Sequence, residues 1–219
     1  ADILRIWVAN SNFNEDIKIS YQSLDRQAES YRKIRNTIRF ILGNLNNSLP
    51  NTKTDHDKIL PLEKFIRHKL YTLNKKINLE YEEFNFSKVF QMILHFCSQE
   101  LSALFFDIRK DALYCDGKDS LVVQSTKTVM ADVFHCLIRW LAPIIPFTSE
   151  EAWQCWRNDI KKENYLSCHL LNKIELSDDW NNELLEEEWT KILEIKNAFT
   201  YAVEKKRNLK EIKSSLEAR

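Results

Sequence analysis

The scarcity of glycine and proline most limits how this chain can fold. Its 219 residues include only two glycines and four prolines. A fold made of many short strands needs frequent turns, and these two residues supply much of the turn chemistry. Leu, Ile, Lys, Glu and Asn are abundant instead, and this composition suits long helices. The chain is therefore predicted to be mainly α.

Apolar residues recur at helical spacing through most of the sequence. In the first helix they extend from Ser20 or Ser23, either of which could cap its start, to about Leu45. After a polar loop at 46–60, further helices are predicted from Pro61 to about Glu83, from Asn85 or Ser87 to Cys115, from about Ser120 to Leu141, and from Thr148 or Ser149. The helix that ends at Cys115 is long enough to suggest a bend midway. Together these segments predict an up-and-down helical bundle.

Two parts of the sequence have a different pattern. Residues 1–19 contain ILRIWVAN and DIKIS, and residues 165–171 read YLSCHLL, so short β-like pieces are expected in both places. A last helix is predicted from Glu183 to about Asn208. We therefore expect a linker at 1–19, a helical bundle at 20–158, and an appended segment at 159–219 that holds a strand-like piece and the final helix.

Charge and cysteine content indicate the setting of the protein. The 32 basic and 32 acidic residues cancel, so any affinity for nucleic acid must come from local clusters. Five cysteines without a C-x-x-C pair favour a reducing, cytoplasmic compartment. The apolar run at 129–147 is interrupted by Asp132, His135 and Arg139, which favours a buried helix over a membrane span. The first residues, ADILRIWVAN, read as a start inside a longer protein.

The sequence offers no catalytic motif. A Gly-rich phosphate loop, G-x-S-x-G and H-E-x-x-H are all missing, so no catalytic residue is assigned. Three close pairs of His and Cys could suggest a metal: His95/Cys97, His135/Cys136 and Cys168/His169. Neighbouring residues on a helix or strand do not normally point at one ion, so these are interpreted as buried thiols and as core or capping histidines, and no metal site is predicted.

The stretch YRKIRNTIRF, residues 31–40, is the most informative local cluster. On a helix, Arg32, Asn36 and Arg39 follow one another at i, i+4 and i+7 beside the apolar stripe, with Lys33 further into solvent. Forked guanidinium donors suit phosphate oxygens, and an Asn amide can read base edges. The alternative is a solvated helix face on which Arg35 pairs with a carboxylate near the core.

A second basic cluster lies near the end of the final helix. It contains Lys205, Lys206 and Arg207, followed by Lys210 and Lys213. Cations in a last helical turn interact favourably with the helix dipole, which would be a purely structural role. Contact with RNA phosphates is the alternative.

Several motifs together resemble one family. ADILRIWVAN, YRKIRNTIRF, FNFSKVFQMILHFCSQELSALFFDIRKDALYC, WLAPIIPFTSEEAW and SSLEAR are similar, in order and spacing, to the helical anticodon-binding region of bacterial-type isoleucyl-tRNA synthetases, which are class I enzymes. LAPIIPFTSEEAW is shared with valyl and leucyl relatives, whereas the RNT-containing helix and SSLEA are typical of the isoleucyl branch. The resemblance implies a class I anticodon-binding bundle.

The resemblance also implies a function. The region would grip the anticodon stem and help to read the loop of isoleucine tRNA, with Arg32, Arg35, Asn36 and Arg39 facing RNA. Arg35 could instead be a buried partner of Asp107 or Asp111. The family usually has Gly where this chain has Lys213, so the turn before SSLEA could be built differently.

The parent enzyme is expected to be a cytoplasmic, monomeric isoleucine-tRNA ligase that uses ATP, magnesium and zinc. Its HIGH and KMSKS signatures, editing domain and zinc-binding cysteines are absent here, so this region itself would bind RNA without a cofactor and would adjoin the catalytic domain of the same chain. The alternatives are a helical protein-interaction scaffold and the matching domain of a valyl or leucyl synthetase.

Overall fold

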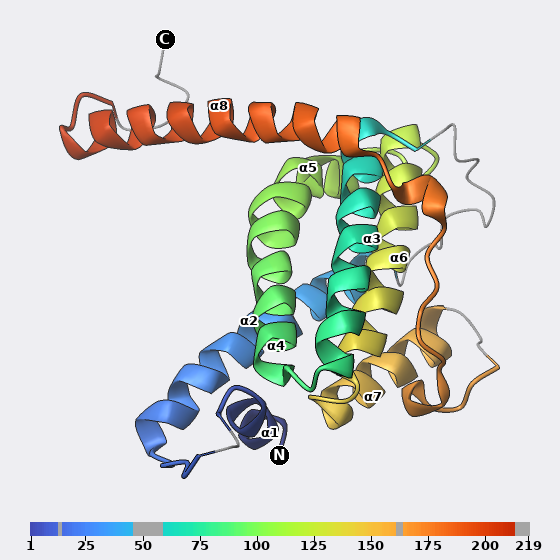
Figure 1. Ribbon diagram of the computed structural model, residues 1–219. Helices are drawn as coiled ribbons and strands as arrows, with labels where there is room; N and C mark the ends of the chain where they lie inside the picture. The colour runs from blue at the N-terminus through green and yellow to red at the C-terminus, as the bar shows by residue number, and fades with distance from the viewer. Residues whose placement is uncertain (13–14, 46–58, 161–163, 213–219) are drawn as a thin grey trace. The chain divides into compact units, whose positions relative to one another are not determined.

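The computed structural model describes residues 1–12, 15–45, 59–160 and 164–212, and regular structure within these ranges is helical (Figure 1). The chain forms two compact units, Ala1–Trp180 and Asn181–Arg219. The first unit contains α1 (Asp2–Ala9), α2 (Tyr21–Leu45), α3 (Pro61–Glu82), α4 (Phe86–His95), α5 (Asp107–Cys115), α6 (Leu121–Leu141) and α7 (Pro146–Cys155). The second contains α8 (Glu183–Asn208). The mainly α prediction is confirmed.

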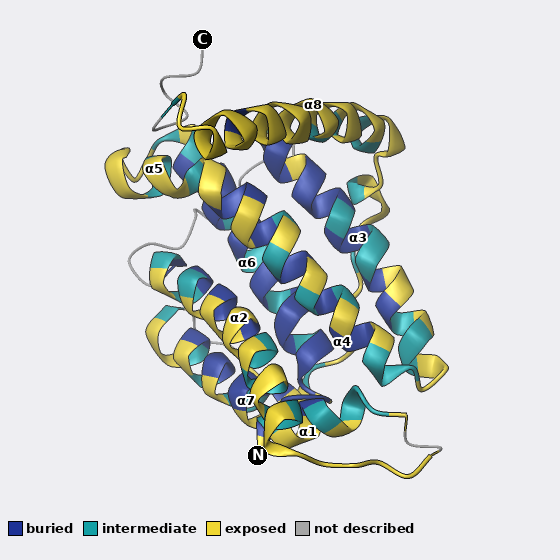
Figure 2. Ribbon diagram, turned by 90° about the vertical axis from the view of Figure 1, so that its left-hand side faces the viewer, coloured by how far each residue is buried: buried dark blue, intermediate teal, exposed yellow. Residues whose placement is uncertain are grey.

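The core of the first unit is built around α6. This helix packs against α2, α3 and α7, and α3 and α6 lie side by side (Figure 1). Buried residues run along α3 and α6 (Figure 2). Fully buried aromatic side chains from several helices fill the interior, among them Phe65, Phe90, Phe134 and Trp153. Removing this much apolar surface from water is the main force that holds the bundle together.

Two π-helical segments interrupt the regular α-helices. One, Phe96–Phe106, joins α4 to α5, and the other, Trp156–Ile160, extends α7. The continuous run from Phe86 to Cys115 curves in Figure 1, as its length suggested. This run and α6 are long and apolar enough to cross a membrane. The most apolar windows of the two are nevertheless 50% and 61% buried inside the protein, as in core helices.

The β-like pieces expected near the N-terminus and at 165–171 are not seen in the described residues. DILRIWVA forms α1, with Ile6 buried and the Arg5 side chain donating hydrogen bonds to the carbonyls of Ile144 and Pro143. Within YLSCHLL, Cys168–Leu170 forms a 3₁₀ turn. Side chains of α7 bind this backbone in place of a neighbouring strand: Trp153 and Gln154 donate to the carbonyls of Tyr165 and Leu166. Tertiary contacts therefore override a weak β-propensity.

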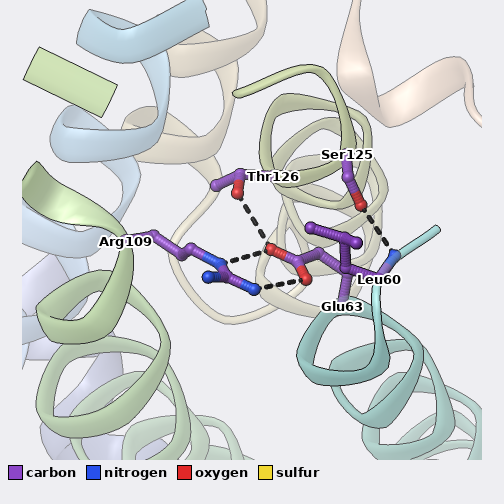
Figure 3. Close-up of polar contacts among 5 residues, drawn as sticks. All are labelled: Leu60, Glu63, Arg109, Ser125 and Thr126. Carbon is purple, nitrogen blue, oxygen red and sulfur yellow. Dashed lines mark hydrogen bonds and ion pairs between the residues drawn. The ribbon is translucent and has the colours of Figure 1, made fainter. Parts of the chain in front are cut away.

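A buried ion pair fixes the start of α3 (Figure 3). The Glu63 carboxylate is fully buried and accepts two hydrogen bonds from the Arg109 guanidinium of α5, at 2.7 and 2.9 Å. The Thr126 hydroxyl of α6 donates a third, at 2.9 Å. Beside it, the Leu60 amide donates to the Ser125 hydroxyl at 3.1 Å. Three helices are thus held in one register by a carboxylate whose hydrogen-bonding needs are largely met.

The unit that contains α8 shows a regular helix with well-formed ends. The Asn182 side chain accepts a hydrogen bond from the Leu185 amide at 3.0 Å, which caps the N-terminus. Acidic residues occupy the first turn and basic residues the last, so both ends complement the helix dipole. Lys213 and the SSLEAR segment lie outside the described residues, as does most of the loop predicted at 46–60.

Candidate nucleic-acid interface

The predicted basic residues of α2 lie on its solvent face. The stripe Ile34, Thr37, Ile38, Ile41 and Leu45 is buried, which fixes the rotation of the helix about its axis. The side chains that the sequence singled out all belong to exposed residues: Arg32, Lys33, Arg35, Asn36 and Arg39. We call these five residues the α2 basic row. Serine capping holds the start of the helix, since the Ser20 hydroxyl accepts from the Ser23 amide at 3.1 Å.

Arg35 is exposed, so it is not the buried partner of an acid near the core. Asp107, one of its two expected partners, pairs with Lys110 at 2.8 Å instead. The side chains of Lys33, Arg35 and Arg39 form no ion pair with the described residues. Arg32 pairs with Glu29 on the same helix, a surface contact of little energetic weight. Most of the row's positive charge is therefore available to an outside partner.

Two arginines of the α2 basic row also line a pocket. The pocket has a volume of about 330 Å³ and lies between α2, α7 and the π-helical extension of α7. Its charged lining comprises Arg35, Arg39, Glu151 and Asp159, and its apolar lining includes Ile38, Leu42 and Ala152. Mixed charges around an apolar surface suit a flat group that has both hydrogen-bond donors and acceptors, such as a nucleobase.

Sequence reasoning missed the α7 side of this pocket. Glu151, Cys155 and Asp159 follow one another at intervals of four residues, so they share a helix face. That spacing was a usable signal, but only the packing of α7 against α2 shows what the face meets.

The second predicted cluster, Lys205, Lys206 and Arg207, occupies the last turn of α8 and is exposed. Arg207 pairs with Glu204 at 2.6 Å, and Lys206 lies 3.7 Å from Glu211. These neighbours offset part of the positive charge, while the position in the last turn satisfies the helix dipole. The cluster therefore lies where its cations can interact favourably with the dipole of α8. Contact with RNA stays a prediction.

Comparison with known proteins shows which family the chain belongs to. The family described as the anticodon-binding domain of tRNA ligase matches residues 63–219, which is most of the sequence. The chain belongs to this family.

The similarity of this anticodon-binding domain to isoleucine–tRNA ligases extends over its whole length. It is 40% identical to the enzyme of Pelagibacter ubique, and 39% identical to those of Agrobacterium fabrum and Fervidobacterium nodosum. Each alignment covers all of this chain but only 22–24% of the relative, so the domain spans less than a quarter of those proteins. The family predicted from the sequence motifs is confirmed.

Proposed function

We propose that this domain holds the anticodon stem and loop of isoleucine tRNA for a ligase that attaches isoleucine with ATP. The observation that carries the proposal is the α2 basic row, exposed on one helix and adjoining a pocket of mixed charge. The similarity to isoleucine–tRNA ligases supports the choice of tRNA and amino acid. The parent enzyme would be cytoplasmic, and its catalytic domain would belong to the same chain.

In this proposal, phosphate and base contacts have different roles. The cations of the α2 basic row neutralise phosphates of the anticodon stem and release bound counterions, so binding weakens steeply as salt rises. Asn36 and the pocket lined by Arg35 and Arg39 receive an unstacked base of the loop. Because the chain has no net charge, this attraction is local and directs the RNA to one face.

Filter binding of the 219-residue chain to isoleucine tRNA across a salt series tests the proposal. Arg35→Ala and Arg39→Ala should each weaken binding about fivefold, roughly 1 kcal/mol per lost contact. Loss of a phosphate contact should also lower the salt slope by about 1. Lys76→Ala is the matched control, because Lys76 is an exposed cation on α3 outside the row.

Two results would contradict the proposal. If both arginine variants bind isoleucine tRNA with the affinity and salt slope of the unmodified chain, the α2 basic row does not contact RNA. If valine tRNA competes as well as isoleucine tRNA, the row binds tRNA without selecting it, and discrimination lies elsewhere in the parent enzyme.

A further inference from the structure

Three metal-binding residue types meet beside α7. Glu150 lies on α7, and Cys168 and His169 lie in the 3₁₀ turn that packs against it. One ligand atom of each, a carboxylate oxygen, a sulfur and a ring nitrogen, lies within 4.8 Å of the other two. We propose that Glu150, Cys168 and His169 bind a divalent zinc-type ion. This inference does not depend on the proposed RNA function.

The 3₁₀ turn explains why two adjacent residues can share an ion. In a strand, successive side chains point to opposite faces, which is why the sequence excluded Cys168 and His169 as a pair. A 3₁₀ turn reduces this divergence to about 120°, and at this turn one ligand atom of Cys168 and one of His169 lie within 4.8 Å of each other and of Glu150. The Ser167 hydroxyl accepts a hydrogen bond from the His169 amide at 3.2 Å and fixes the start of this turn.

The Glu150 carboxylate is already oriented as a ligand would be. One oxygen accepts from the Gln154 amide at 2.6 Å, and the other accepts from the Ser167 hydroxyl and the Cys168 amide at 2.8 and 2.9 Å. The Cys168 thiol donates a further hydrogen bond to this carboxylate, so a bound ion would take the place of the thiol proton between the two groups.

The exposure of the other two ligands suits uptake of an ion. Cys168 is only 2% exposed, so its sulfur is shielded from solvent, whereas His169 is exposed and can turn towards an arriving ion. Sulfur, nitrogen and oxygen ligands with a fourth position left for water are typical of zinc. On binding, the Cys168 thiol releases its proton to solvent as the zinc–sulfur bond forms, and neutral His169 donates a ring nitrogen lone pair.

The geometry requires only a local adjustment. Zinc bonds of about 2.0–2.3 Å in a tetrahedron place ligand atoms roughly 3.3–3.6 Å apart. The atoms here are separated by up to 4.8 Å, so a rotation of the exposed His169 side chain must bring its nitrogen closer. The bound ion would cross-link the irregular segment around residue 168 to α7.

Cobalt titration of the chelator-treated, tag-free 219-residue chain tests the proposal, because Co²⁺ is a coloured stand-in for zinc. One Co²⁺ per chain should bind with a near-ultraviolet sulfur-to-cobalt band, and Zn²⁺ should displace it. Loss of a side chain that only orients a ligand costs about 10–100-fold in metal affinity. His169 is itself a proposed ligand, so His169→Ala should weaken Co²⁺ binding by at least about 100-fold. Gln154→Ala should weaken it about tenfold.

The controls separate this site from other thiols and histidines. Cys115→Ser and His95→Ala remove an exposed cysteine and an exposed histidine outside the cluster and should leave the titration unchanged. Cys168→Ser should abolish the band. Because Cys168 is buried and its variant could unfold, the exposed His169 decides the test through a second readout. Zinc should raise the Tm of the unmodified chain but not that of His169→Ala.

Two outcomes would overturn the proposal. In one, no sulfur-to-cobalt band forms in the unmodified chain. In the other, His169→Ala binds Co²⁺ as tightly as the unmodified chain and its Tm rises equally with zinc. Glu150 would then serve only to orient the turn around Cys168.

Discussion

At the residue scale, two helices are followed by a non-glycine residue in the left-handed backbone conformation. Phe84 and Lys210 are the non-glycine residues with positive φ among those that the structure describes, at 59° and 58°. They follow the ends of α3 and α8, where the amides of Asn85 and Glu211 reach back to the carbonyls of Glu80 and Lys206. Glycine normally occupies this left-handed position after a helix. Here both available glycines lie elsewhere, and neither has positive φ.

Phe84→Gly should therefore stabilise the protein. A residue with a Cβ pays about 1–2 kcal/mol in this conformation, and the greater freedom of glycine in the unfolded chain offsets part of the gain. We expect an increase in unfolding free energy of about 0.5–1 kcal/mol, measured by urea denaturation. Phe84 is 66% exposed, so the packing lost is mainly its edge-on contact with the Phe86 ring.

Leu79→Gly is the matched control for this change. Leu79 is also exposed but lies inside α3, so glycine there should destabilise by about 1 kcal/mol. Equal effects from the two substitutions would show that the left-handed backbone at Phe84 carries no strain.

At the element scale, polar contacts between helices fix positions that apolar packing leaves open. Glu63 connects α3 to α5 and α6 (Figure 3), and the Asp2 carboxylate of α1 accepts a hydrogen bond from the Thr148 amide in the first turn of α7, at 2.8 Å. Asp2 thus caps the N-terminus of α7 although it lies 146 positions before Thr148 in the sequence. Such contacts determine which helices meet and in what register.

Arg109→Met should destabilise the protein strongly. It leaves the fully buried Glu63 carboxylate without its cation, and breaking a buried pair costs about 3–5 kcal/mol. Lys110→Met removes the exposed neighbouring pair with Asp107 and should leave the urea midpoint nearly unchanged, because surface ion pairs contribute little to stability. Urea denaturation of both variants measures the difference. Similar midpoints would mean that the Glu63 pair contributes no more than a surface contact.

At the scale of the whole molecule, the chain divides into two compact units. Its contacts define one unit through Trp180 and a second from Asn181. The division into a linker, a bundle and an appended segment, expected at 19/20 and 158/159, stays a prediction. In the proposed parent ligase, anticodon binding would position the acceptor end of the tRNA in the catalytic domain.

Arg39→Ala in the full-length ligase should then lower aminoacylation without changing ATP–pyrophosphate exchange. Aminoacylation kcat/KM for tRNA should fall about fivefold, because roughly 1 kcal/mol of RNA binding is lost. ATP–pyrophosphate exchange needs no tRNA and should be unchanged, and Lys76→Ala should alter neither. A parallel fall in both activities would indicate damage to the fold and would remove the evidence for an RNA contact at Arg39.

The sequence alone determined the helical class, the family and the position of Arg32, Asn36 and Arg39 beside the apolar stripe of α2. These depend on local information: scarce glycine and proline, apolar residues at helical spacing, and motifs in a fixed order. A one-dimensional pattern suffices here because the rotation of a long amphipathic helix follows from its own apolar stripe.

Tertiary structure alone decided the partners. Arg109 of α5, not Arg35, meets a buried acid, and that acid is Glu63 of α3, 46 residues away in the sequence. The segment YLSCHLL forms a turn instead of a strand, because α7 side chains bind its backbone, and this turn brings Cys168 and His169 to Glu150. Contacts between distant segments depend on how helices pack, and local propensity is too weak to specify that packing.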